Sequence, residues 1–405
     1  MFWVYPDIGE RILGNRVVIK FGGADLSTGE KVAQAAKMVA DANYKEIIVV
    51  VSAMGKTTDN LLNTTMQMGD VSDADYAELI SMGERVSARF FCSALRTQGI
   101  QAELFDPCND NWPLITDSNF RNARLNIEKT TELARKFIAP LLSESIPVIC
   151  GFTGKDPNGR ITVLGRGGSD TTALVLAKCL DADEVILVKE TNGVLSADPK
   201  IVAEARALSR LDIHEMFDLA QGGAKIVKPE ALRYKQPNQM LRVVDFSSDN
   251  LAVGGTEITG SLDVNSSETH SRNDLIAINV VCEVNAENIS EVFSSLTQKP
   301  IYGVSSGSRS ITVFTSDGNI TEVMRKLHSI PGFKAVSHRE NVAMLQVSHP
   351  TFIESPGGVA ALSTALSQKN INIIEVTTSK ATINVFIEEK QLKRAKEAIS
   401  NVVTS

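Results

Sequence analysis

The stretch GFTGKDPNGRITVLGRGGSDTTALVLAKCL, residues 151–180, carries the most specific signal in the sequence. A strand pattern leads into Gly167 and Gly168, and a strongly apolar helix pattern follows them. Glycines let backbone amides approach an anion closely, and a helix N-terminus adds partial positive charge. Arg166 can bind a carboxylate through two hydrogen bonds, while Ser169 and the amides position it. We therefore predict a binding site for an anionic substrate at this turn.

Asp170 follows directly in the same turn. An ionised carboxylate accepts hydrogen bonds and donates none, so Asp170 can orient nearby lysines or act on a proton. A simple helix-capping role for Asp170 would leave Arg166 and the two glycines beside it unexplained. We favour a functional role for the whole turn.

Apolar runs of strand length alternate with amphipathic helix patterns on both sides of this stretch. The runs with the length and composition of buried strands are RVVIK (16–20), EIIVVVS (46–52), SIPVICGF (145–152) and DEVILVK (183–189). Such alternation predicts right-handed βαβ units and an α/β fold, with a mostly parallel sheet sandwiched by helices. We assign residues 1–250 to this domain.

The composition changes near residue 250. Residues 251–273 are rich in Ser, Gly, Asn and Asp, which predicts a linker. Residues 274–405 then give two shorter passes of strands and helices, which begin at LIAINVVCEV (275–284) and NVAMLQVSH (341–349). The passes share a pattern but little residue identity, so we predict two small α+β ferredoxin-like units.

The first strand run ends in Lys20, and Gly22 and Gly23 follow it. Amides in such a turn can approach phosphate oxygens, and Lys20 can neutralise charge that develops on a transferred phosphoryl group. A plain strand-to-helix turn explains the same residues about equally well.

The next loop reads VSAMGKTTDNLL, residues 51–62. Gly55, Lys56 and Thr57 suggest a P-loop, but that motif needs a glycine where this chain has Val50. We therefore reject the P-loop and expect residues 57–59 to cap the following helix, with a hydroxyl left to face a substrate.

Two further segments offer weaker signals. Glu84, in MGERVSARFF (82–91), either complements a helix start or accepts a substrate ammonium group. The segment VKETNGVLSADPKIV (188–202) is a polar loop after a strand, which is where a nucleotide binds in an open parallel sheet. Lys225 follows a Gly-Gly pair and can reach phosphate, although alone it would be read as a surface lysine.

Composition excludes several other classes of protein. The formal charge of −7 argues against nucleic-acid binding. No apolar run is long enough to span a bilayer, and charged residues interrupt the N-terminal segment, so neither a membrane span nor a signal peptide is expected. The five cysteines and five histidines are scattered, which predicts a cytoplasmic protein with no metal-binding residues.

Taken in order, these motifs resemble the amino-acid kinase family and, within it, the aspartate kinases. They cover about residues 15–235, and the C-terminal region is similar to the paired ACT domains of those enzymes. The motifs that carry the resemblance are KFGG (20–23), VSAMGKTTDNL (51–61), GE (83–84), GFTG (151–154), GRGGSD (165–170), GVLSADP (193–199) and GAK (223–225).

The resemblance implies ATP-dependent phosphorylation of the L-aspartate side-chain carboxylate, with Mg²⁺ shielding the phosphates, as the first step of lysine, threonine and methionine biosynthesis. It implies L-aspartate and ATP as partners and a homodimer or higher homo-oligomer formed through the ACT domains. Catalytic roles fall to Lys20 and Asp170. Aspartate would be held by Thr58, Glu84, Phe152, Arg166 and Ser169. The nucleotide would be held by Lys20, Gly22, Gly23, Glu190, Asp198, Lys200 and Lys225.

Several positions depart from the family pattern. Ala24-Asp25 replaces the usual Thr-Ser after KFGG, and Lys189-Glu190 stands where Thr-Asp or Lys-Asp is usual. EVNAENISEVF, in the first C-terminal unit, has no glycine before its helix, so feedback inhibition by lysine or threonine is not a secure inference. Two alternatives stay open: a kinase of the same fold that acts on the hydroxyl of homoserine, and a non-catalytic amino-acid-sensing subunit.

Overall fold

The structure is a computed structural model that describes residues 15–165, 167–248, 250–262, 268–296, 299–316, 320–348, 352, 357–379 and 382–403. The chain divides into two compact units, residues 1–262 and 263–405. Among the helices of these described ranges, none is long and apolar enough to cross a membrane.

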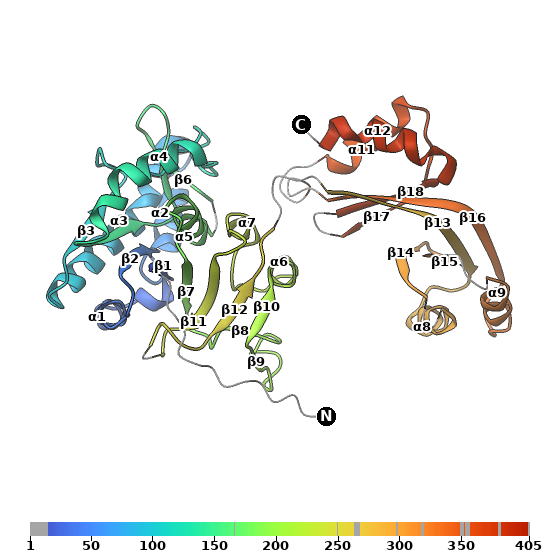
Figure 1. Ribbon diagram of the computed structural model, residues 1–405, viewed down its shortest axis with the longest axis horizontal. Helices are drawn as coiled ribbons and strands as arrows, with labels where there is room; N and C mark the ends of the chain where they lie inside the picture. Colours follow the sequence, from blue (N-terminus) through green and yellow to red (C-terminus); the bar gives the residue numbers. More distant parts are fainter. Residues whose placement is uncertain are drawn as a thin grey trace. The chain divides into compact units, whose positions relative to one another are not determined.

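The N-terminal unit is built on an eight-stranded sheet with the strand order β10-β12-β11-β7-β1-β2-β4-β3 (Figure 1). All neighbouring strands are parallel except β11 and β12. The strands are β1 Arg16–Phe21, β2 Glu46–Val51, β3 Ala102–Phe105, β4 Ile146–Cys150, β7 Glu184–Lys189, β10 Arg210–Asp212, β11 Met240–Asp245 and β12 Thr256–Thr259. The predicted mostly parallel α/β sheet is therefore confirmed.

Helices cover both faces of this sheet. The connections from β1 to β2 and from β2 to β3 run in one direction, whereas those from β3 to β4 and from β4 to β7 run back. Right-handed crossovers therefore place α1 and α3 on one face and α4 and α5 on the other. The helices are α1 Gly29–Ala40, α2 Thr57–Gln67, α3 Asp73–Thr97, α4 Ile127–Phe137, α5 Gly168–Cys179, α6 Ile213–Gln221 and α7 Pro229–Leu232.

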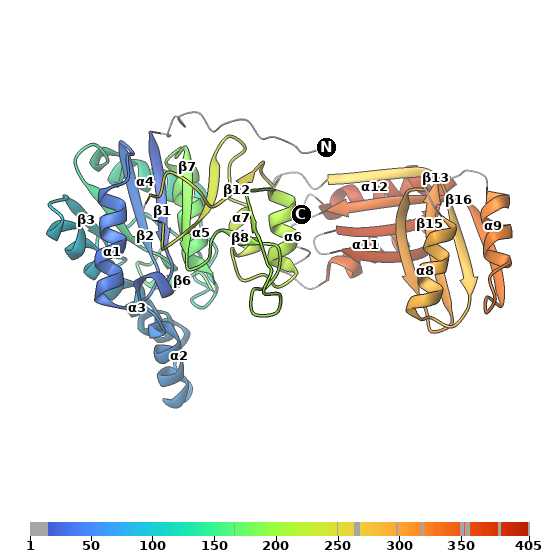
Figure 2. The ribbon, with the colours of Figure 1, turned by 90° about the horizontal axis from the view of Figure 1, so that it is seen from below.

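Figure 2 shows α2 extending away from the sheet. Short strands and 3₁₀ helices complete the N-terminal unit. Two small hairpins, β5–β6 and β8–β9, follow β4 and β7. The short elements are β5 Thr153–Lys155, β6 Ile161–Val163, β8 Val194–Leu195, β9 Ala207–Leu208 and the 3₁₀ helices η1 Ala24–Leu26 and η2 Ala139–Leu141.

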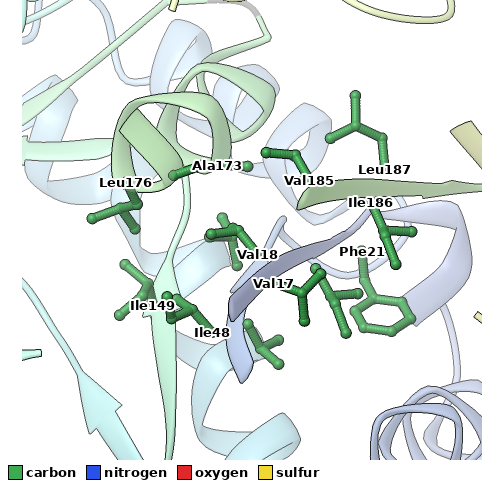
Figure 3. Close-up of a cluster of buried hydrophobic side chains, with 14 of the residues drawn as sticks. Val17, Val18, Phe21, Ile48, Ile149, Ala173, Leu176, Val185, Ile186 and Leu187 are labelled. Carbon is green, nitrogen blue, oxygen red and sulfur yellow. The ribbon is translucent and has the colours of Figure 1, made fainter. Parts of the chain in front are cut away.

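The core of the N-terminal unit lies where the central strands meet α5 and α3. The β-branched side chains of β1 point to both faces of the sheet and are all buried, as expected for a strand covered on both sides. Phe21 also packs on Phe91 of α3, with ring centroids 5.3 Å apart. Figure 3 shows part of this core, with Val17, Val18, Phe21, Ile48, Ile149, Ala173, Leu176, Val185, Ile186 and Leu187.

The C-terminal unit is one antiparallel sheet with the strand order β14-β15-β13-β16-β18-β17. Figure 1 shows the helix pair α8–α9 at one end of this sheet and the pair α11–α12 at the other. Each pair covers its own hydrophobic core. The elements are β13 Glu268–Val281, α8 Ala286–Ser295, β14 Ile301–Ser306, β15 Ser310–Ser316, α9 Ile320–His328, β16 Ala335–Ser348, α11 Gly358–Gln368, β17 Ile373–Ser379, β18 Thr382–Glu388, η3 Glu389–Gln391 and α12 Leu392–Val403.

Two long strands join these two α+β units into one sheet. β13 and β16 each have 14 residues and pair along most of their length, so each serves both helix pairs. A register shift between Arg272 and Ala277 bends the ladder where one unit gives way to the other. On the face of the sheet away from the helices, Phe314 and Phe386 stack with ring centroids 3.7 Å apart.

Some local expectations differ from the structure. The stretch 251–273, expected as a linker, contributes β12 to the first sheet and the start of β13 to the second. The sequence analysis also predicted no strand at β14, because Gly303 and the serines of IYGVSS obscure the alternation of apolar and polar residues that marks a strand.

Candidate active site

The carboxyl ends of β1, β2, β4 and β7 lie at one edge of the sheet, because these four strands are neighbours and parallel. The chain leaves the edge through turns that carry the sequence motifs, and these turns line a cleft of about 810 Å³. Such an edge is where open parallel sheets bind their ligands. Predicted site residues that line the cleft are Lys20, Gly23, Thr58, Glu84, Phe152, Ser169, Asp170 and Lys225.

Lys20 and Asp170 form the central ion pair of the cleft. Lys20 Nζ lies 2.6 Å from Asp170 Oδ1, and both side chains are almost fully buried. Lys189, at the end of β7, approaches the other carboxylate oxygen at 3.6 Å. Burial alone would raise the pKa of Asp170, but Lys189 and Lys20 hold it below its ordinary value. The carboxylate therefore stays ionised and fixes both ammonium groups at the cleft floor.

The register between β1 and β7 brings Lys20 and Lys189 to the same face of the sheet. Lys20 and Leu187 are paired in register on β1 and β7, so Lys189 lies two residues beyond Lys20 on the adjacent strand. Side chains two residues apart on neighbouring strands point to the same face. Burial, opposed by Asp170 and reinforced by Lys20, lowers the pKa of Lys189 to about 8.

Gly22 and Gly23 bring the first turn into contact with the second loop. A Cβ on Gly23 would lie 2.6 Å from the carbonyl oxygen of Ala53, so only glycine fits there. The carbonyl of Gly23 accepts a hydrogen bond of 2.8 Å from the Gly55 amide. The predicted phosphate turn is thus held against the VSAMG loop by close backbone packing.

Asp25 lies inside the same turn and is 1% exposed. Its Oδ2 accepts a 2.8 Å hydrogen bond from the Gly22 amide. Burial raises the pKa of Asp25 to about 6, although the Gly22 hydrogen bond and the charges of Lys20 and Lys189 oppose the shift. The chain thus places a second carboxyl group beside the lysines of the cleft.

Glu84 also lines the cleft, and it occupies the middle of the 25-residue helix α3. The expectation that Gly83-Glu84 opens a helix is therefore wrong, and so is the helix-start role considered for this acid. Gly83 instead lets α3 approach the VSAMG loop, because a Cβ there would lie 2.7 Å from Ala53 Cβ. That approach brings Glu84 Oε1 within 3.2 Å of the Ala53 amide.

The second oxygen of Glu84 is buried and has no hydrogen-bond partner among the described residues. Burial raises the pKa of Glu84 to about 8, against the opposing effects of the Ala53 amide and Lys20. An unsatisfied buried acid is costly, so its persistence at a cleft wall favours a cationic ligand that completes its bonding. This is the chemistry expected for an acceptor of a substrate ammonium group.

Phe152 and Ser169 meet where β4 and α5 approach each other. Phe152 adopts a positive φ of 66°, which is uncommon for a non-glycine residue, and its amide donates a 3.1 Å hydrogen bond to Thr172 Oγ1. Gly151, just before it, leaves room for Ser169, whose Cβ would lie 2.7 Å from a Cβ at that position. The contacts hold both side chains at the cleft wall.

Thr58 lines the cleft from the first turn of α2. The expectation that residues 57–59 cap this helix is wrong, because the helix begins at Thr57 and its N-cap position is Lys56. The Thr57 hydroxyl donates to the Met54 carbonyl at 2.6 Å. This hydrogen bond holds the start of α2, where Thr58 lies, against the loop that precedes the helix.

Some predicted residues are not brought to the cleft wall. Glu190 pairs with Lys31 Nζ at 2.5 Å, while Asp198 and Lys200 lie in an exposed loop after β8. In the structure as described, none of these three lines the cleft. Arg166, the predicted carboxylate-binding residue, lies outside the described residues.

Sequence reasoning missed Lys189 and Asp25 as site residues. The missing signal for Lys189 was its place at the end of a strand that neighbours β1, which the linear sequence does not reveal. For Asp25 the signal was present: an acid three residues after a phosphate-type glycine. In the sequence, Lys189 and Asp25 stand out only as departures from a family pattern.

The described residues contain no group of three or more His, Cys, Asp or Glu side chains that could hold a metal ion. Mg²⁺ is commonly bound through substrate phosphates with few protein ligands. A magnesium ion held mainly by nucleotide phosphates would need no such group.

Models of known families match both units of the chain. The amino acid kinase family matches residues 15–245, and the ACT domain matches residues 337–401. An aspartokinase of Corynebacterium glutamicum is 31% identical over 409 residues, which cover 95% of this chain and 94% of the relative.

Solved structures give the same likeness. An aspartate kinase from Synechocystis superposes with a TM-score of 0.75 at 25% identity, covering 96% of this chain and 69% of that one. Escherichia coli aspartokinase III, in complex with aspartate and ADP, superposes with a TM-score of 0.56 at 21% identity, covering 95% of this chain and 99% of that one.

Proposed function

This chain belongs to the amino acid kinase family and carries an ACT domain, and we propose that it is an ATP-dependent aspartate kinase. It transfers the γ-phosphoryl group of ATP to the side-chain carboxylate of L-aspartate, giving ADP and 4-phospho-L-aspartate. The aspartokinase relatives, which align with almost the whole chain, support the choice of aspartate as acceptor.

One observation carries the proposal. The buried Lys20–Asp170 pair, joined by Lys189, lines the same cleft as the buried, incompletely bonded Glu84. Two fixed ammonium groups suit the negative charge of a transferred phosphoryl group. An acid without a cation suits the α-ammonium group of an amino acid. The cleft thus provides complementary charges for both substrates.

The reaction asks for little covalent chemistry from the protein. A carboxylate oxygen of aspartate attacks the γ-phosphorus, and the bond from that phosphorus to the β–γ bridging oxygen breaks, so that ADP leaves with the electron pair. The acceptor is already ionised, so no base needs to remove a proton from it. Catalysis then rests on positioning and on charge stabilisation.

Residues of this chain divide that work. Lys20 and the Gly22 and Gly23 amides stabilise charge on the phosphoryl oxygens, and Asp170 holds Lys20 and Lys189 in position. Mg²⁺ enters with ATP and shields the phosphate charge. Lys225, which also lines the cleft, lies beside the nucleotide, while the amino acid is held by Thr58, Glu84, Phe152, Arg166 and Ser169.

The test is ADP release from purified protein with aspartate, homoserine or glutamate as acceptor. We expect turnover on aspartate. Turnover on homoserine alone would contradict the proposal and favour a hydroxyl-phosphorylating kinase of the same fold. Absence of turnover on all three would favour a non-catalytic sensor, although the retained Lys20–Asp170 pair argues against such a decayed site.

We also propose that the C-terminal unit forms a homodimer or a higher homo-oligomer. Its edge strands β14 and β17 each have one side without a strand partner in the described sheet, and Ile301 and Val304 on β14 are exposed. Such edges pair readily with a second chain. Light scattering of the purified protein tests this, and a monomer at micromolar concentration would contradict it.

Regulation and location complete the proposal. Adding lysine or threonine to the ADP-release assay tests whether the C-terminal unit inhibits the enzyme.

A cytoplasmic location agrees with the five cysteines, all of which are free. Detection of the protein in an oxidising compartment, by cell fractionation, would argue against that location.

A further inference from the structure

Asp25 is a buried charged group to which the proposed phosphoryl transfer gives no role. Its Oδ2 accepts the Gly22 amide hydrogen bond, whereas its Oδ1 is buried without a hydrogen-bond partner among the described residues. A Cβ on Gly22 would lie 3.0 Å from Asp25 Oδ2 and 3.8 Å from Lys20 Nζ, which places the carboxyl within the phosphate turn. A carboxyl with one unsatisfied oxygen at this place is suited to a change of partner.

The charges around Asp25 come from several elements. Lys20 on β1 and Lys189 on β7 attract its negative charge, while Glu190 at the end of β7 repels it. Both lysines also pair with Asp170 on α5. The two lysines and two aspartates therefore balance when all four are ionised.

Lys31 on α1 connects the turn that carries Asp25 to Glu190, the residue after β7. Its Nζ contacts Glu190 at 2.5 Å and donates to the Ala24 carbonyl at 3.0 Å. The turn that carries Asp25 is thereby tied to the end of β7. Asp25 has little freedom to move away while this contact persists.

Entry of a nucleotide upsets the balance. Its phosphates bring several negative charges to Lys20 and the Gly22–Gly23 amides, beside the Asp25 carboxylate. Like charges a few ångströms apart in a partly buried site repel strongly. A proton on Asp25 removes the repulsion and lets the carboxyl donate a hydrogen bond to a phosphate oxygen.

We propose that Asp25 is a positioning residue for the nucleotide, ionised in the free protein and protonated when phosphates enter the turn. The inference rests on the proposed function, because it requires the nucleotide to occupy this turn. Burial already raises the pKa of Asp25 to about 6, so the free protein carries the ionised form near pH 7. Nucleotide binding then takes one proton from the buffer, and nucleotide affinity falls as pH rises.

The experiment is calorimetric titration of the full chain with MgAMP-PNP, a non-hydrolysable ATP analogue that keeps the γ-phosphoryl group, at about pH 7 in two buffers of different ionisation enthalpy. The dependence of the heat on the buffer gives the number of protons taken up. We expect about one proton per site in the wild type, and about none near pH 5, where Asp25 is already protonated. The dissociation constant should rise by up to about tenfold per pH unit above pH 6.

Asp25→Asn is the isosteric variant, since its amide oxygen can still accept the Gly22 hydrogen bond. We expect it to bind MgAMP-PNP with almost no proton uptake and a flat pH dependence between about pH 6 and 7.5. The control is Asp41→Asn, which removes an exposed acid at the end of α1 and should behave like the wild type. If the Asn variant does not fold, Asp25→Ser and the wild-type comparison at the two pH values decide the question.

The outcomes separate this inference from the proposed function. Nucleotide binding with the same proton uptake in wild type and Asp25→Asn would overturn the role of Asp25 and leave the kinase proposal intact. Nucleotide binding without proton uptake in the wild type would do the same. Absence of MgAMP-PNP binding by the wild type would instead overturn the proposed function.

Discussion

Two buried acids of the cleft, Asp170 and Glu84, are in opposite electrostatic states. At the proposed phosphate site Asp170 contacts two lysines, which keep its pKa below the ordinary value. At the proposed amino-acid site Glu84 accepts the Ala53 amide hydrogen bond and has its pKa raised to about 8 by burial. Both side chains are almost fully buried, so exposure does not explain the difference.

The difference teaches how the site divides its work. The proposed phosphate site assembles its charges during folding, so its groups are in place before any substrate binds. The proposed amino-acid site leaves one carboxyl oxygen of Glu84 without a hydrogen-bond partner among the described residues, so a substrate ammonium group would complete its bonding. The first arrangement favours rate, and the second favours selection of an amino acid.

The strongest way to break this comparison is Asp170→Asn. Removal of the carboxylate charge leaves Lys20 and Lys189 to repel each other, so both move from the phosphoryl group. We expect kcat to fall about 10³-fold, with the KM for aspartate nearly unchanged. Steady-state ADP release measures both constants.

A matched control for this variant is Asp181→Asn, which alters an exposed acid just after α5 that pairs with Arg135. It should keep wild-type kinetics. Retention of kcat within about threefold by Asp170→Asn would mean that Asp170 does not position the lysines.

Glu84→Gln tests the proposed site for the substrate ammonium group. The amide keeps the Ala53 hydrogen bond but cannot carry the negative charge that the ammonium group needs. We expect the KM for aspartate to rise about 100-fold and the KM for ATP to change little. Equal increases in both constants would show that Glu84 serves the whole cleft. Glu78→Gln, on the exposed part of the same helix, is the control.

The unpaired state of Glu84 should also appear in stability. Its pKa is about 8 in the folded chain, against an ordinary value of 4.5, so between these limits the native state binds a proton that the unfolded state has released. Stability therefore falls as pH rises through this window. Above pH 8 we expect Glu84→Gln to exceed the wild type in unfolding free energy by up to about 5 kcal/mol.

Urea unfolding followed by the fluorescence of buried Trp112 in the N-terminal unit measures this effect. The two proteins should converge near pH 4.5. A variant that loses stability at all pH values would indicate that Glu84 is stabilised by a partner, contrary to the contrast with Asp170.

The smallest effect that we expect is the pH dependence of aspartate binding at saturating ATP. Ionised Glu84 binds the ammonium group, and the ionised fraction rises as pH approaches about 8. We expect kcat/KM for aspartate to rise by up to about tenfold between pH 7 and 8 in the wild type and to stay flat in Glu84→Gln. A wild-type profile that falls over this range would contradict the assignment.

Much of the fold follows from the sequence. The β-branched runs at 16–20, 46–52, 145–152 and 183–189 predict strands that the structure places at the centre of the parallel sheet. The predicted membership of the amino-acid kinase family with an ACT domain is confirmed. Element boundaries were less accurate, as β12 within the expected linker and the mid-helix position of Glu84 demonstrate.

The site divides in the same way. Residue types and glycine spacing by themselves indicated an anion-binding site at the turns of Lys20 and Asp170, because backbone approach and charge are local properties. Only the tertiary structure decided that Lys189 and Asp25 lie beside them, and that one oxygen of Glu84 has no hydrogen-bond partner among the described residues. Neighbouring parallel strands bring distant residues to one edge, and burial then sets their pKa values. Neither effect is visible along a linear chain.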